Sequence, residues 1–331
     1  MPLHPVRDRA RHLGDLRLLA RAGAGVLHAV GTPARRAREG GRPVTILVGH
    51  PPRPHDRSAI SYAAMLARTR GMGLHVVSVL PAPWPAVPGR ASTAAQEAHR
   101  ERALGYATTV LAEVAPDLPA TVEVVPGRSV AGTLLARARE VDASLVVIGS
   151  VDEGPWDRVA IGSTGDRLLH AADRAVAVAT RGFSTHAVPR FTRATCAFRA
   201  DRASVEVLRR IGQICADSGA ALRVATFGVE GRTMYPPEVA GEEEVVAAFV
   251  DQARAAQAAA LAQVAAPEGV ECTVAVGPDW ATAIGRLAWR HDDILVLGSA
   301  TGGLLSRVLL GANAYRILRH APVPVVLVPE T

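Results

Sequence analysis

The chain has 331 residues, a length that predicts two domains of about 150 residues each. Although 49 % of the residues are hydrophobic, no uncharged apolar run reaches the roughly 18 residues of a membrane span, so we expect a soluble protein, and the reduced thiols expected below indicate a cytoplasmic one. The net charge of +6 resides in residues 1–42, which leaves a neutral body with 4 % aromatic residues and argues against nucleic-acid binding by that body.

Residues 1–42 predict a basic, flexible arm. Leu13, Leu16 and Leu19 recur at helical spacing, and a linker rich in Gly and Arg follows them. Asp15 and the nearby arginines interrupt any apolar segment of a secretory signal. A basic amphipathic segment suits an anionic lipid or nucleic acid, whereas a disordered or wrongly assigned N-terminus explains it more simply.

Between residues 43 and 181 the pattern alternates between strand and helix. Runs of β-branched residues bounded by Gly and Pro predict strands, and apolar residues three and four apart predict helices. In chain order we expect strand 44–49, helix 57–70, strand 74–80, helix 94–114, strand 120–127, helix 129–140, strand 144–149, helix 163–172 and strand 175–180.

After a linker at 182–189, the same order returns in residues 190–331. We expect strands near 193–198, 222–228, 270–276, 294–298 and 324–328, and helices near 203–218 and from Glu242 onward.

The two halves align at a constant offset. VVIGS (146–150) matches LVLGS (295–299) at an offset of 149 residues, and the same offset sets ILVGH (46–50) on TCAFR (195–199). A repeat of this length indicates a duplicated domain, because solenoid repeats are roughly 20–50 residues long.

Each copy predicts a doubly wound α/β domain. Continuous β-branched runs such as LVVIG indicate strands buried on both faces, as in a parallel sheet covered by helices. We therefore expect two tandem, mostly parallel, five-stranded sheets of Rossmann-like type. Binding sites in such sheets lie at the carboxyl ends of the strands, which here are the loops after residues 49, 149, 198 and 298.

The loop between the fourth strand and the last helix of the first copy carries the clearest chemical signal. Gly149 ends the strand and Ser150 follows it, and Gly162 precedes Ser163 and Thr164 at the start of the helix. Glycines let backbone N–H groups approach a phosphate, and a helix N-terminus adds free amides and the positive end of its dipole. The pattern predicts an anion-binding loop.

The second copy carries related residues in the corresponding loop. The candidates there are Gly298, Ser299, Gly302, Gly311 and Asn313. Neither loop has the Lys of a P-loop, an evident general base or a metal-ligand set, so we expect binding without catalysis.

The strand–loop–helix–strand segments that end the two copies resemble the corresponding segments of the universal stress protein family. The C-terminal GANAYRILRHAPVPVVLVP (311–329) is similar to the end of that family, and LRVATFGVEGRTMYPPEV (222–239) to its tandem, two-domain actinobacterial forms. The resemblance implies a fold like that of the adenine-nucleotide alpha hydrolases, a stress-response or regulatory role and ATP, with Mg²⁺, as ligand. Any ATP hydrolysis is expected to be slow and incidental.

The resemblance also implies a motif, G-x2-G-x9-G-[ST], which is incomplete in both copies. In the first copy Asp152 stands where the motif has its middle glycine, and Glu153 and Asp157 add negative charge. In the second copy Thr301 takes that place and Ala312 replaces the hydroxyl residue.

A second departure concerns the Asp that the family's ATP binders carry just after the first strand, near the adenine. Here the corresponding residues are His50-Pro51 and Arg199-Ala200. Two interpretations therefore remain open: a nucleotide-binding or sensing protein, and a nucleotide-independent scaffold with degenerate loops. An enzyme of the related superfamily would need an SGGxDS-type or HIGH-type motif, which neither PPRPHDRS nor RADRAS provides.

Other reactive side chains predict structural roles. The cysteines show no metal-ligand spacing and are expected to be reduced core thiols: Cys196, Cys215 and Cys272. The histidines most open to a functional interpretation are expected to be loop or surface residues: His50, His55 and His291. Ser163, Asp166 and His170 could be arranged as a catalytic triad on paper, but the chain has no GxSxG turn.

The last strand of each copy is apolar. An uncovered strand of this kind promotes association. By resemblance to the family, strands 175–180 and 324–329 are expected to pair across a two-fold axis and form an intramolecular pseudo-dimer, with Ala175 where the second copy has Pro324. Two such chains could associate again as a homodimer.

Overall fold

The computed structural model describes residues 26–29, 38–39, 42–82, 93–184, 189–230, 242–299 and 311–329. Within these ranges no helix is long and apolar enough to cross a membrane. The predicted amphipathic stretch at Leu13, Leu16 and Leu19 lies outside the described residues, as do Thr301 and Gly302.

The strands of the first half are β1 (Val26–Ala29), β4 (Thr45–Gly49), β5 (Gly73–Pro81), β6 (Ala120–Gly127), β7 (Ala143–Ile148) and β8 (Ala175–Val178). Those of the second half are β9 (Arg193–Ala197), β10 (Ala221–Val229), β11 (Glu271–Gly277), β12 (Asp293–Gly298) and β13 (Val325–Val328). The short strands β2 (Arg38–Glu39) and β3 (Arg42–Pro43) form a separate pair.

The helices of the first half are α1 (Ser58–Arg70), α2 (Thr93–Val114), α3 (Val130–Glu140) and α4 (Ser163–Ala171). Those of the second half are α5 (Arg202–Ser218), α6 (Glu242–Leu261), α7 (Trp280–Gly285) and α8 (Ala312–His320).

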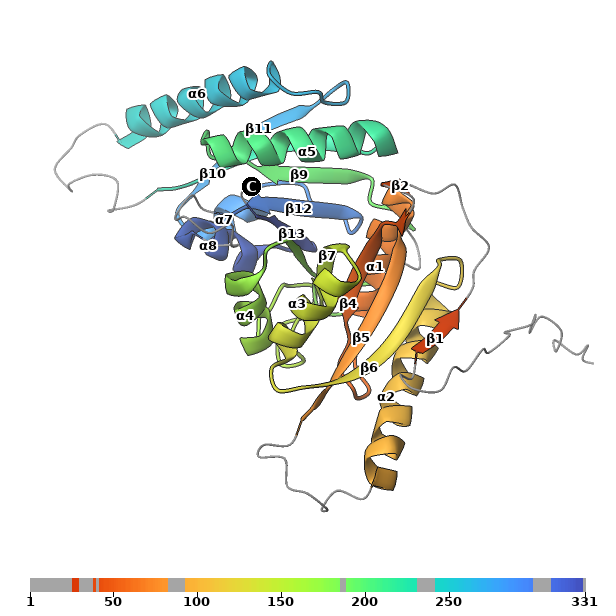
Figure 1. Cartoon of the computed structure of the whole chain (residues 1–331). Helices are drawn as coiled ribbons and strands as arrows, with labels where there is room; N and C mark the ends of the chain where they lie inside the picture. The colour runs from red at the N-terminus through yellow and green to blue at the C-terminus, as the bar shows by residue number, and fades with distance from the viewer. Residues whose placement is uncertain are drawn as a thin grey trace, which may run out of the picture.

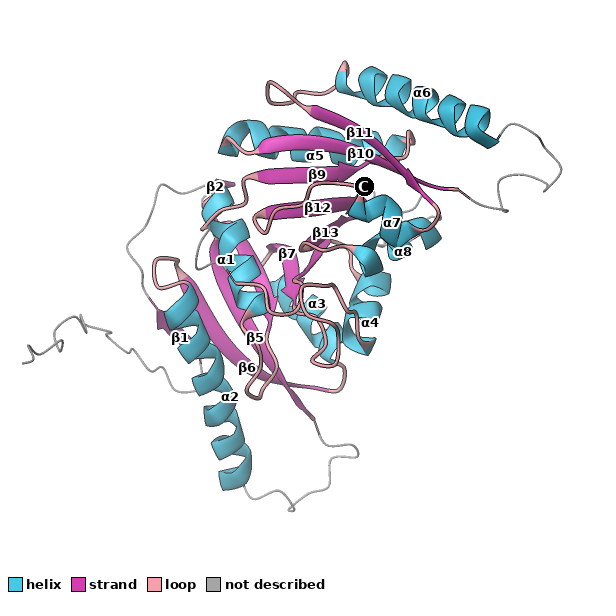
Figure 2. Ribbon diagram, turned by 180° about the vertical axis from the view of Figure 1, so that it is seen from behind, coloured by secondary structure: helices cyan, strands magenta, loops and turns pink. Residues whose placement is uncertain are grey.

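One sheet of eleven strands runs through the described part of the chain (Figures 1 and 2). Its order is β1-β6-β5-β4-β7-β8-β13-β12-β9-β10-β11. Each copy contributes five parallel strands in the same order, counted outward from the junction of β8 and β13. The predicted fold class, two tandem doubly wound α/β domains, is confirmed.

The two copies join through their last strands. β8 and β13 pair antiparallel, with Val178 opposite Val325, Ala177 opposite Val326 and Val176 opposite Leu327. The expected pairing of the final strands is therefore present, and it merges two sheets into one. Because each last strand covers the edge of the other, neither apolar edge faces solvent at the junction.

Helices cover both faces of the sheet, and the strand pleat divides the core between them. Ile46 and Val48 of β4 pack in the layer formed with α1 and α5, whereas Leu47 packs in the layer formed with α3, α4 and α8. This alternation follows from the two-residue period of a strand. It explains why most strand residues are apolar on both faces of the sheet.

The ends of α1 and α5 show how the repeat is preserved locally. Each helix is followed by a glycine in the left-handed conformation, Gly71 with φ 65° and Gly219 with φ 73°. Glycine adopts this conformation without the penalty that a Cβ imposes, and it is common at helix C-termini. A tight turn then returns the chain to β5 and β10.

Two features differ from the sequence-based expectation. Residues 26–29, expected within the flexible arm, form β1 and pair antiparallel with β6. The predicted offset of 149 residues is also one residue too long for the first strands. Ile46 of β4 pairs with Leu145 of β7, and Ala194 of β9 pairs with Ile294 of β12. Since Leu145 and Ile294 are equivalent at the offset of 149, Ile46 is equivalent to Ala194, at an offset of 148. Because side chains alternate between faces, this single residue decides which layer each side chain enters.

The cysteines divide into two groups. Cys196 and Cys215 are buried, and burial raises the pKa of each thiol to about 12, so both act as apolar core residues as predicted. Cys272 on β11 is exposed, which corrects the expectation that all three lie in the core. No disulfide forms between them in the described chain.

Leu327 tests the junction of the two copies, because its side chain is fully buried beside β8. Leu327→Ala should lower the free energy of unfolding by about 2–5 kcal/mol, since it removes buried methyl groups and leaves a cavity. Val130→Ala is the matched control, because Val130 is 41 % exposed, and it should change stability by no more than about 0.5 kcal/mol. Urea denaturation measures both. Equal effects of the two substitutions would show that the junction does not stabilise the fold.

Candidate functional site

A cavity of about 300 Å³ lies at the carboxyl ends of the first copy's strands. Its walls come from the segments that follow β4 and β7, from the ends of β5, and from the first turns of α3 and α4. Doubly wound sheets place their binding sites at this edge, because the loops there diverge to the two sides of the sheet. The cavity lies on the α3 and α4 side.

All five site residues predicted in the first copy line this cavity: Gly149, Ser150, Gly162, Ser163 and Thr164. Gly162 precedes α4, and no side chain caps the first amides of that helix. A Cβ at Gly162 would lie 2.4 Å from Val151 Cγ1, so only glycine fits there without a shift of the loop. The cavity therefore contains an uncapped helix N-terminus.

Ser150 has a structural task within this set. Its side chain is 2 % exposed, its hydroxyl donates to the Ala179 carbonyl at 2.7 Å, and it accepts from the Ala160 amide at 3.0 Å. These bonds hold the loop between β7 and α4 against the sheet. Of the two hydroxyl residues beside the glycines, Ser163 is the exposed one.

Asp152, at the motif's middle glycine position, is paired within the cavity wall. Its Oδ2 accepts from Arg53 at 2.7 Å, and its Oδ1 lies 2.6 Å from His55 Nδ1. Burial acts to raise the pKa of Asp152, but the hydrogen bond from Arg53 and the nearby positive charges outweigh it and hold the pKa below its ordinary value. The carboxylate is ionised at neutral pH, and its charge is partly compensated.

The other two acids of this loop separate. Glu153 lines the cavity, whereas Asp157 is exposed and lies outside the cavity lining. Asp157 has a positive φ of 55° and its amide donates to the Arg181 carbonyl at 3.1 Å. The negative charge expected near a phosphate is therefore that of Asp152 and Glu153.

His50 was expected to be a loop or surface residue. It lies in the loop that follows β4, but it is buried, with 4 % exposure, and it lines the cavity. Neither ring nitrogen has a hydrogen-bond partner among the described residues, and burial lowers the pKa of His50 to about 4. His50 is therefore a neutral imidazole in the cavity wall, and both of its ring nitrogens are buried. The feature of the sequence that could have indicated this burial is the position of His50 directly after a buried strand.

His55 also lies in this loop, as expected, although its side chain is only 8 % exposed and lies against Asp152. His291 is exposed, as expected. Within the described residues no group of three or more His, Cys, Asp or Glu side chains is arranged to hold a metal ion.

The triad that can be written from the sequence does not assemble. Asp166 Oδ1 lies 3.6 Å from His170 Nδ1 on the surface of α4, and both side chains are half exposed. Ser163 precedes His170 by seven residues on the same helix, a separation of roughly 10 Å along the axis. The hydroxyl and the imidazole therefore cannot act on one substrate atom.

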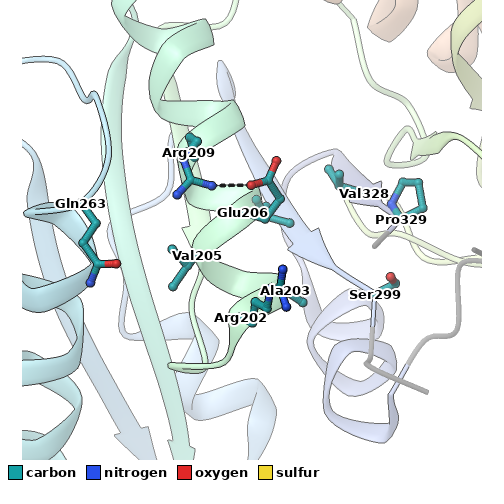
Figure 3. A pocket seen from close by; sticks show the side chains of 10 residues that line it. Arg202, Ala203, Val205, Glu206, Arg209, Gln263, Ser299, Val328 and Pro329 are labelled. Carbon is teal, nitrogen blue, oxygen red and sulfur yellow. Dashed lines mark hydrogen bonds and ion pairs between the residues drawn. The ribbon is translucent and has the colours of Figure 1, made fainter. Parts of the chain in front are cut away.

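The second copy distributes its candidate residues over both faces of the sheet. Ser299 is buried and lines a cavity of about 600 Å³ with Arg202 and Arg209 of α5 (Figure 3). Gly311 and Asn313 lie at the start of α8, whose apolar side packs in the opposite layer. Gly298 ends β12, with Val207 of α5 3.2 Å from its ideal Cβ position.

The cavity in Figure 3 is thus not the counterpart of the first copy's cavity, because α5 corresponds to α1 rather than to α3 or α4. An ion pair between Glu206 and Arg209, three residues apart on α5, lies in its wall. Among the described residues, the first copy is the one that gathers its predicted site residues around one cavity.

His50 makes the stability of the protein depend on pH. Unfolded His50 binds a proton near pH 6.5 and folded His50 only near pH 4, so the wild type should lose stability as the pH falls between these values. The loss attributable to His50 should be on the order of 3 kcal/mol. His50→Phe should remove it, because Phe198 occupies the corresponding place in the second copy and is 3 % exposed.

Chemical denaturation at several pH values measures the difference between the wild type and His50→Phe. The surface variant His170→Gln serves as the control and should follow the wild type. A wild-type curve parallel to that of His50→Phe from pH 7 to pH 4 would refute the burial of a neutral His50.

Comparison with known proteins agrees with this architecture. The model of the universal stress protein family matches residues 44–180 and again residues 191–329. Universal stress proteins of Mycobacterium tuberculosis and Mycobacterium bovis are each 34 % identical to this chain over 293 residues, which cover 86 % of this chain and all of the relative.

Solved structures share the fold. A universal stress protein from Pseudomonas aeruginosa is 18 % identical with a TM-score of 0.55, covering 87 % of this chain and 94 % of that one. Another, from Archaeoglobus fulgidus, is 15 % identical with a TM-score of 0.55, covering 86 % and 95 %. The chain belongs to the universal stress protein family, with two copies of the family's domain in tandem.

Proposed function

We propose that the first copy binds an adenine nucleotide without turning it over, and that this binding serves a sensing or regulatory role. The observation that carries the proposal is the single cavity that joins an uncapped helix N-terminus to a buried, unpartnered His50. A phosphate and a heterocycle are the two chemistries that such a cavity can satisfy at once.

The phosphate side is formed by Gly162, Ser163 and Thr164. The first N–H groups of a helix and the positive end of its dipole attract an anion, and Ser163 supplies an exposed hydroxyl. Gly149 lines the same cavity, and a Cβ at this position would make only ordinary contacts with Ala59 and His55. The first copy keeps three residues of the family's motif: Gly149, Gly162 and Ser163.

The base side is formed by His50 and the apolar ends of the strands. Val77, Val79 and Ile148 provide an apolar wall for a flat ring. A neutral imidazole can donate one hydrogen bond and accept another, which suits the edge of a heterocyclic base. His50 would thus act in place of the aspartate that the family's ATP binders carry after the first strand.

The composition of the site supports binding without turnover. The chain has no lysine to stabilise phosphoryl transfer, and the described residues form no cluster of metal ligands. Mg²⁺ would therefore arrive with the nucleotide rather than be held by the protein alone.

A nucleotide-independent scaffold is the second candidate function. The contacts of Asp152 with Arg53 and His55 favour it, because they place an anion where the motif has a glycine and pair Arg53 with a carboxylate of the protein itself. Repulsion by Asp152 and Glu153 grows with the number of phosphates. The acidic loop should therefore weaken the binding of ATP more than the binding of AMP.

Calorimetric titration of ATP, ADP and AMP with Mg²⁺ tests the proposed site. Bound nucleotide should raise the free energy of unfolding by roughly 2.7 kcal/mol at a hundredfold excess over Kd. Gly162→Val combined with Ser163→Ala should abolish the effect, whereas Gly311→Val at the corresponding position of the second copy should leave it intact. If none of the three nucleotides binds at millimolar concentration, the protein acts without a nucleotide.

Asp152→Asn tests the role of the acidic loop. The substitution removes a negative charge of the cavity wall and releases Arg53 and His55, so ATP should bind about threefold to tenfold more tightly and AMP should change less. Asp157→Asn is the matched control, because Asp157 lies outside the cavity lining and Asn tolerates its positive φ. An equal gain in both variants would assign the effect to overall charge.

A further inference from the structure

A second cavity, of about 510 Å³, lies where the two copies meet. Its walls are α1 on one side and α5 on the other, and its floor is formed by strands on both sides of the junction: β7, β8, β13 and β12. The first copy's nucleotide cavity is lined by α3 and α4, on the opposite face of the sheet. The two cavities are therefore separate.

This cavity arises from the way the duplication is joined. α1 packs on β4, β5 and β7, and α5 packs on β9, β10 and β12, so the two junction strands lie between the helices. The burial pattern of β13 shows that the space between α1 and α5 is not filled by side chains. Val325 and Leu327 are fully buried on the α8 side, whereas Val326 and Val328 are only partly buried on the side of the cavity.

All but three of the lining residues are apolar, and Ser144, Arg70 and Arg210 are the exceptions. The apolar lining includes Leu66, Leu145, Ile211, Ile214, Val326 and Val328. A volume of this size falls within the roughly 300–1,000 Å³ of small-molecule sites, which are mostly apolar with a few placed polar groups.

The polar exceptions are exposed and two of them are cationic. Arg70 ends α1, and within the described residues no carboxylate pairs with it, although Arg57 and Arg68 of the same helix pair with Glu113 and Asp117. No carboxylate belongs to the cavity lining.

Arg210 reaches the same cavity from α5. It pairs with Glu206 at 2.9 Å one helical turn away, in an exposed contact that contributes little to stability. Guanidinium groups bind carboxylates by charge-assisted hydrogen bonds, so Arg210 can add a bound anion to the contacts that it already makes.

We infer that this cavity binds a single-chain anionic amphiphile, of which a medium-chain fatty acid is the simplest example. The apolar chain would lie on the floor between α1 and α5, and the carboxylate would bind Arg70 and Arg210 with the Ser144 hydroxyl beside them. The inference concerns a site separate from the proposed nucleotide site and does not depend on it.

Sodium decanoate, used below its micellar concentration, is the probe for the full-length protein. Calorimetry should show saturable binding of one decanoate per chain. Decanol, which has the same chain length without the charge, should bind about twofold to fivefold more weakly. ATP should not displace decanoate. Non-saturable uptake, or equal affinity for decanoate and decanol, would overturn the inference.

Variants locate the site. Ala175→Phe fills the floor at the start of β8, where Ala175 is partly exposed, and should weaken decanoate binding at least tenfold with an unchanged circular dichroism spectrum. Arg70→Gln and Arg210→Gln each remove one cation without altering the core and should lower the affinity about twofold to fivefold. Arg102→Gln, on the exposed surface of α2, is their control and should bind like the wild type.

Sedimentation equilibrium tests the alternative that a second copy of the chain occupies the cavity. If the protein is a dimer that Ala175→Phe dissociates and decanoate does not bind, the cavity is a subunit interface and the inference fails. If Ala175→Phe does not fold, the arginine variants decide: equal decanoate affinity in Arg70→Gln, Arg210→Gln and Arg102→Gln contradicts the inference.

Discussion

The antiparallel pairing of β8 with β13 is the contact on which the rest of the structure depends. It unites two parallel sheets into one and covers the apolar edge of each last strand. Because the pairing is antiparallel, the strands of one copy run opposite to those of the other. The carboxyl ends of the two copies' strands, where the candidate site residues lie, consequently point to opposite edges of the continuous sheet. The same pairing leaves the floor between α1 and α5 less covered than the rest of the sheet.

Much of this fold is predictable because duplication leaves a long-range signal. The 149-residue offset and the β-branched runs predicted both sheets, and the apolar final strands predicted their pairing. Local pattern did not predict β1, since Val26–Ala29 is a strand only through its pairing with β6. Hydrophobic periodicity also did not predict that the offset between the two copies is one residue shorter at β4 than at β7. The pairing of β4 with β7 is irregular between Thr45 and Ile46.

The candidate site was predicted in part. The glycines and the start of α4 follow from strand–loop–helix spacing, and all five first-copy residues meet at one cavity. His50 was missed because its burial depends on walls contributed by β5, α3 and α4, which no local window contains. The internal partners of Asp152 were equally hidden, since Arg53 is 99 residues away in sequence.

Hydrogen–deuterium exchange with and without ATP tests the central claim most directly, because it reports on both copies in one experiment. The account predicts slower exchange of the amides at residues 162–165, where α4 begins, and no change at residues 311–314, where α8 begins. Unchanged exchange at both helix starts under saturating ATP, or protection confined to the second copy, would contradict it.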